Sequence, residues 1–121
     1  MLKNISPLIP AGNDVEISVA FYEQKLGFTA IHKEGNPVRM AIVKRDTAEI
    51  FLVQNDYQQL AESISFRILV DNIEQLYQEI LAKSEQVIHP NGKLANKPWG
   101  VKEFVIIDPV GVCITFYEPT S

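Results

Sequence analysis

The residue best suited to bind a ligand is the single tryptophan, Trp99, in the segment Lys97–Gly111, which reads KPWGVKEFVIIDPVG. It lies between Pro98 and Gly100, two turn-forming residues, so it is expected on a loop rather than in the regular core. A large, flat, apolar ring on a loop can stack on a planar ligand, cover the end of a sheet or contact a second subunit. The neighbouring residues alone leave these three roles open.

Other reactive groups are few. Cys113 is the only cysteine, so no internal disulfide can form, and its apolar surroundings, VCITFY, predict a buried, unreactive thiol. The two histidines, His32 and His89, are predicted to be solvated or structural. No Ser-His-Asp order and no glycine-rich phosphate loop is visible. The residues therefore favour a binding protein over an enzyme.

Charge and hydropathy exclude several partners. The net charge of −4 argues against binding nucleic acid through its phosphates, and it suits a small-molecule site, particularly one for a cation. No run approaches the roughly 20 apolar residues of a membrane span, and the first ten residues lack a signal-peptide core. We expect a cytoplasmic protein with no membrane or nucleic-acid partner.

Apolar spacing predicts two helices, one from Asp14 to Gly27 and one from about Asn72. Val15, Val19, Tyr22 and Leu26 line one face of the first, and Ile73, Leu76, Tyr77, Ile80 and Leu81 line one face of the second. The predicted strands are Ile5–Ile9, Phe28–Lys33, Val38–Val43, Glu49–Gln54, Ser65–Val70, Gln86–His89, Glu103–Ile107 and Val112–Glu118.

The order strand, helix and three strands occurs twice, which indicates an internal repeat. Asn13–Glu16 resembles Asp71–Glu74, and Ile50–Val53 resembles Ile114–Tyr117. One half alone would leave a face of its sheet uncovered. We therefore predict an α+β fold with a single domain over residues 1–121. Its two tandem βαβββ modules, about 1–60 and 61–121, would form a curved mixed sheet around a cleft, with the helices outside.

Three segments resemble the vicinal-oxygen-chelate superfamily, which includes glyoxalases, bleomycin resistance proteins and dioxygenases. They are DVEISVAFYEQKLGF, SFRILVDNIEQLYQEI and EFVIIDPVGVCITFYEP, and their order and spacing extend the resemblance over essentially the full chain. PWG, the following EF strand and DPxGxC most resemble the bleomycin-binding resistance proteins.

The resemblance implies a homodimer that sequesters bleomycin or another planar antibiotic, potentially cationic, without modifying it. Resistance proteins exchange their N-terminal strands, and Pro7 matches a proline of theirs. Two departures concern the ligand: His32 stands near an aromatic position, and Arg67 is unexpected beside a cationic drug unless it faces away. The implied ligand-binding residues are Trp99, Phe66, His32, Glu49 and Thr115.

Enzymes of the superfamily hold a divalent metal, and their ligand positions fall here near Ser6 or Pro7 and at Glu49, Ser65 and Thr115. Only Glu49 is a strong ligand, whereas a catalytic site needs about three imidazole or carboxylate groups. We therefore predict no metal, no cofactor and no catalytic residue. The alternative is a metal-dependent lyase or dioxygenase with an atypical site around Glu49.

Overall fold

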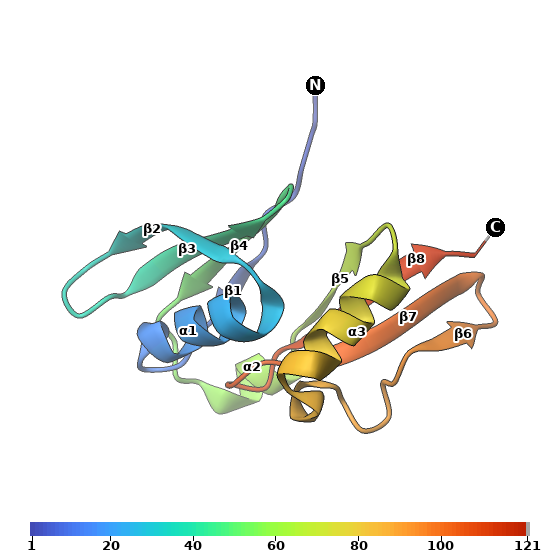
Figure 1. Ribbon diagram of the computed structural model, residues 1–121. Helices are drawn as coiled ribbons and strands as arrows, with labels where there is room; N and C mark the ends of the chain where they lie inside the picture. Colours follow the sequence, from blue (N-terminus) through green and yellow to red (C-terminus); the bar gives the residue numbers. More distant parts are fainter. Residues whose placement is uncertain (121) are drawn as a thin grey trace.

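The chain forms two βαβββ modules, each a four-stranded mixed sheet with one helix, in a computed structural model that describes residues 1–120 (Figure 1). The first module contains β1 (Leu8–Pro10), α1 (Val15–Leu26), β2 (Thr29–Glu34), β3 (Met40–Arg45) and β4 (Ala48–Val53), in the sheet order β1-β4-β3-β2. The second contains β5 (Ser65–Leu69), α3 (Ile73–Lys83), β6 (Ala95–Lys97), β7 (Val101–Ile107) and β8 (Cys113–Pro119), in the order β5-β8-β7-β6. Helix α2 (Gln58–Ser63) connects the modules, and a short 3-10 helix, η1 (Glu85–Val87), follows α3.

Helix α1 begins and ends where its capping residues predict, whereas α3 begins after Asn72 without a side-chain cap from that residue. Asp14 accepts a hydrogen bond from the backbone N–H of Glu16, and Gly27 ends α1 with a left-handed φ of 74°. At α3, Glu118 of the neighbouring strand accepts from the backbone N–H groups of Asn72 and Ile73 at 2.9 and 3.0 Å. These hydrogen bonds lower the pKa of Glu118, because they favour the charged carboxylate at a helix N-terminus.

Each sheet has one face covered by a helix and one face left open. In the first sheet Val43 and Ile50 are buried under α1, whereas their neighbours Ile42 and Phe51 are only half-buried. The second sheet repeats this alternation, with its helix-side residues packed under α3. The helix-side residues of the two sheets are Ala41, Val43, Ile50 and Leu52 in the first, and Phe104, Ile106, Ile114 and Phe116 in the second.

The α+β class and the two modules are confirmed, but one chain holds two separate sheets instead of a single curved one. The helices α1 and α3 contact each other between the sheets, so the open faces lie on the outer sides of the helix pair (Figure 1). A buried hydrogen bond of 2.8 Å from the Tyr22 hydroxyl to Asp108 joins α1 to the second module. Burial raises the pKa of the Asp108 carboxyl. Burial and the nearby Asp108 carboxylate together raise the pKa of the Tyr22 hydroxyl well above its ordinary value.

Three expectations about single elements differ from the structure. The predicted strand Gln86–His89 is wrong. Its first two residues belong to η1, Ile88 forms only an isolated bridge with Ile106, and the edge strand is β6. A short apolar run such as Val87-Ile88 can be buried without pairing fully. Strand β1 begins at Leu8 rather than Ile5. Cys113 is half-buried on the open face of the second sheet, so its thiol is more accessible than predicted.

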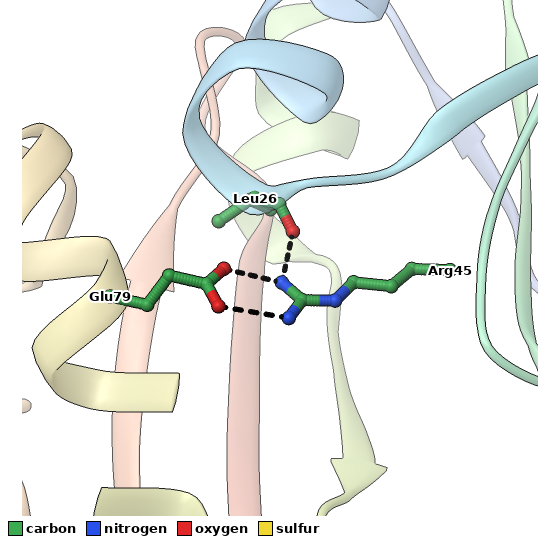
Figure 2. A network of polar contacts seen from close by, with 3 residues as sticks. All are labelled: Leu26, Arg45 and Glu79. Atoms are coloured by element: carbon green, nitrogen blue, oxygen red, sulfur yellow. Dashed lines mark hydrogen bonds and ion pairs between the residues drawn. The ribbon is translucent and has the colours of Figure 1, made fainter. Parts of the chain in front are cut away.

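A bidentate ion pair between the modules gives the first testable prediction (Figure 2). Arg45, at the end of β3, donates to both carboxylate oxygens of Glu79 on α3 at 2.7 and 3.1 Å, and to the carbonyl of Leu26 at 2.8 Å. We expect Glu79→Gln to lower the free energy of unfolding by about 1–2 kcal/mol, less than for a buried pair since both side chains are partly exposed. Urea unfolding near neutral pH measures this difference.

The same ion pair predicts how stability changes with pH. The hydrogen bonds from Arg45 lower the pKa of Glu79 below its ordinary value of 4.5. The stability from Glu79 is therefore present above pH 4.5 and is lost as the pH falls through the folded-state pKa. Glu16→Gln, which removes the exposed ion pair with Lys33, is the matched control and should change stability by less than about 0.5 kcal/mol. Equal effects of the two variants would contradict a structural role for Glu79.

Candidate ligand-binding site

Trp99 lies at the tip of the β6–β7 hairpin. Lys97 pairs with Val101, so residues 98–100 form the loop between the two strands. Gly100 has a φ of +85°, which an L side chain rarely adopts, and its N–H donates to the carbonyl of Lys97 at 3.1 Å. The loop is therefore a closed turn that projects the tryptophan, whose relative exposure is 61%.

A carboxylate fixes the orientation of this ring. The indole Nε1 donates to Oε1 of Glu103 at 3.1 Å. Glu103 belongs to β7, and its side chain is only 9% exposed. Because a rigid strand holds Glu103, the exposed indole is preorganised rather than free to rotate.

An arginine from another strand shares the same carboxylate oxygen. Both terminal nitrogens of Arg67 on β5 donate to Oε1 of Glu103 at 3.4 Å, and its Cζ lies 4.3 Å from the centroid of the Tyr117 ring. Thr115 pairs with Arg67 in register, and Tyr117 pairs with Glu103, so all four side chains lie on one face. This is the open face of the second sheet. We refer to Trp99, Glu103, Arg67, Tyr117 and Thr115 as the Trp99 cluster.

Phe66 requires a correction to the expected site. It neighbours Arg67 on β5, so its side chain projects to the opposite face, where it is paired with Ile114 and packed against the core. Phe66 therefore supports the sheet from the helix side and does not line the open face.

His32 and Glu49 lie on the open face of the first sheet. His32 pairs in register with Ile42 and forms an exposed ion pair with Glu34 at 3.3 Å. Glu49 accepts a long hydrogen bond of 3.4 Å from Ser6, beside a cavity of about 160 Å³. Within residues 1–120 no hydrogen bond or ion pair joins either residue to the Trp99 cluster, so one chain presents two separate sets.

Comparison with known proteins identifies the family. The Glyoxalase/Bleomycin resistance protein/Dioxygenase superfamily profile matches residues 6–116. The chain belongs to this superfamily. It is 33% identical to a bleomycin resistance protein of Geobacillus stearothermophilus over 98% of this chain and 97% of that protein. The same figures apply to a bleomycin resistance protein of Staphylococcus aureus.

Solved structures share the fold. A bleomycin resistance determinant encoded on transposon Tn5 superposes with a TM-score of 0.82 at 19% identity, covering 99% of this chain and 100% of that one. A bleomycin-binding protein complexed with bleomycin gives a TM-score of 0.81 at 20% identity, covering 97% and 98%. The family profile and the 33% identical relatives confirm the resemblance to bleomycin resistance proteins found in the sequence, and the solved structures confirm the fold.

The metal positions of the superfamily do not form a metal site here. In residues 1–120 no group of three or more His, Cys, Asp or Glu side chains is placed to hold an ion. Glu49 is accompanied by the Ser6 hydroxyl and by Lys44, its partner across β3 and β4. A single carboxylate with a lysine opposite it does not fit a divalent cation. Ser65 and Thr115 belong to the other sheet.

A cavity of about 830 Å³ lies between the two modules, away from the Trp99 cluster. Its lining includes Leu26, Phe28, Phe116 and the Arg45–Glu79 ion pair, and it contains none of the five residues expected in the site. The cavity is therefore the space left where the two modules meet.

In the same residues, 1–120, no helix is long and apolar enough to cross a membrane.

The alternation of apolar and polar residues along a strand is the sequence signal that could have placed Arg67 and Glu103 on the open face. In SFRIL, Phe66 and Ile68 are the apolar residues of the core side, which places Arg67 on the opposite face. The cluster itself depends on β5, β8 and β7 lying side by side, with the β6–β7 loop carrying Trp99. That arrangement becomes visible only with the sheet order.

Proposed function

We propose that this protein binds and sequesters bleomycin or a related planar antibiotic without modifying it. The observation that carries the proposal is the exposed Trp99 ring, which Glu103 holds in one orientation on an open sheet face. Such a ring offers a stacking surface to planar heterocycles. Relatives that are 33% identical over nearly the whole chain are named bleomycin resistance proteins, which supports the same ligand class.

The proposed groove needs a second copy of the chain. The open face of the first sheet carries Leu8, Ile42 and Phe51, which pair in register, and Leu8 is 67% exposed. We propose a homodimer in which this face of one copy lies opposite the Trp99 cluster of the other. The dimer would bury the apolar strip and bring His32 and Glu49 toward the tryptophan.

The N-terminal segment supports an exchanged arm in this dimer. Met1, Leu2 and Ile5 are at least 90% exposed, and the segment extends away from the body of the chain (Figure 1). Exposed apolar side chains on an extended segment would be buried if they lay on the partner. We propose that residues 1–7 of each copy pack on the other.

Two further proposals concern the domain and the compartment. The two modules, about 1–60 and 61–121, form one domain, because buried residues of both belong to one core and Tyr22 hydrogen-bonds Asp108 across them. A sequestering protein acts where its antibiotic acts, and we propose the cytoplasm. The contacts of Glu49 do not favour the metal-dependent lyase or dioxygenase.

Titration with bleomycin tests the proposed function. Trp99 is the only tryptophan, so bleomycin should quench its emission saturably. The recovered drug should have an unchanged mass, and elemental analysis should find no stoichiometric divalent metal. Kanamycin, which is cationic but not planar, is the control and should leave the emission unchanged. Absence of quenching would withdraw bleomycin as the ligand, and altered drug or one metal per chain would favour the enzyme.

A further inference from the structure

Arg67 is the cation of the Trp99 cluster, and part of it is available to a ligand. Two of its N–H groups donate to Glu103, and the guanidinium lies over Tyr117. Its side chain is nevertheless 45% exposed. Within residues 1–120 the hydrogen bonds of Arg67 all go to Glu103, which leaves its other N–H groups without a protein acceptor.

Glu103, in contrast, already has a counter-ion, and its Oε1 atom accepts from two partners. Its side chain is 9% exposed, and one oxygen accepts from both the Trp99 indole and the Arg67 guanidinium. A cationic ligand group at Oε1 of Glu103 would have to displace Arg67 from that oxygen and from the Tyr117 ring. If Arg67 stayed in place, the two positive charges would repel each other at short range.

We propose that Arg67 selects a ligand whose stacked ring itself carries a hydrogen-bond acceptor, such as a carboxamide or carboxylate oxygen. The inference rests on the proposed function, because it takes Trp99 as the stacking platform. Arg67 donates to the acceptor from above Tyr117, and Glu103 positions both Arg67 and the indole. Cationic groups of the ligand lie away from the stacked ring, so the protein's net charge of −4 attracts them elsewhere.

Three probes test this selectivity: naphthalene-2-carboxylate, naphthalene-2-carboxamide and 2-naphthylmethylammonium. They share the naphthalene ring system and differ only in the substituent. The readout is the single indole N–H signal in the NMR spectrum of isotope-labelled protein, since that N–H donates to Glu103 inside the cluster. We expect both acceptor probes to bind about tenfold more tightly than the ammonium probe, as for a hydrogen bond to a charged group.

Variants of Arg67 separate its hydrogen bonds from its bulk. Arg67→Met keeps an apolar stem over Tyr117 but leaves Glu103 without its counter-ion, so the preference should invert toward the ammonium probe. Arg67→Lys keeps the charge without the planar fork, and should retain a reduced preference for the carboxylate. Thermal unfolding verifies that each variant is folded.

Equal or tighter binding of the ammonium probe to the wild type would overturn the inference. So would an unchanged order of affinities in folded Arg67→Met, or failure of all three probes to shift the indole signal. A bleomycin titration on the same samples keeps the two proposals distinct. If the probes behave as expected and bleomycin does not bind, the drug is withdrawn and Arg67 keeps its role; if bleomycin binds while the probe order is wrong, only the role of Arg67 fails.

Discussion

Trp99→Ala should weaken bleomycin binding by about 1–3 kcal/mol, as expected when an aromatic anchor is truncated. That loss corresponds to roughly a 5- to 150-fold rise in the dissociation constant. The protein should remain folded, because the ring is 61% exposed at the tip of a hairpin and contributes little to the core. Calorimetry measures the affinity, since the variant lacks the only tryptophan fluorophore.

Two further variants make this result specific. Tyr57→Ala removes an aromatic side chain of similar exposure, 60%, at the start of α2, and should leave the affinity unchanged. Trp99→Phe should lose less than Trp99→Ala, because a smaller ring can still stack, although it no longer donates to Glu103. An unchanged affinity in folded Trp99→Ala would return this tryptophan to a structural role.

The helices could be predicted because their signals are local. Each apolar face repeats within one segment, and the Asp14 cap and the Gly27 stop lie directly at the ends of α1. The strands in the second half of the chain were harder to predict, since β6 is only three residues long and has no buried residue of its own. A strand that short is defined by its partner, β7, and not by its own pattern.

The position of an expected site residue could be predicted only where it follows from the residue's immediate neighbours. Trp99 qualifies, because Pro98 and Gly100 already place it on a turn. Phe66 was expected in the site, but its neighbour Arg67 lies there instead, since a shift of one residue along a strand moves a side chain to the other side of the sheet. Whether His32 and Glu49 lie near Trp99 depends on how the two sheets are placed. That placement is a long-range property, and the periodicity of one segment does not contain it.

The open face of the first sheet predicts the largest effect on assembly. Phe51 lies at its centre, half-buried and paired in register with Leu8 and Ile42. If this face covers the Trp99 cluster of a second copy, Phe51→Glu places an unpaired charge in each of two equivalent interfaces. We expect dimer dissociation to increase by about a hundredfold or more, since burying one unpaired charge costs several kcal/mol.

Bleomycin binding should fall with the dimer in this variant, although Trp99 is unchanged, because the groove would lose one wall. Light scattering at micromolar concentration measures the assembly, and calorimetry measures the affinity. Ile17→Glu is the matched control: Ile17 is 59% exposed on α1, outside both open faces, and its variant should remain a dimer that binds the drug. If Phe51→Glu unfolds, the milder Phe51→Ser should still weaken the dimer. A folded Phe51→Glu monomer with full affinity would place the whole groove on one chain, and a Phe51→Glu dimer with full affinity would move the interface to another surface.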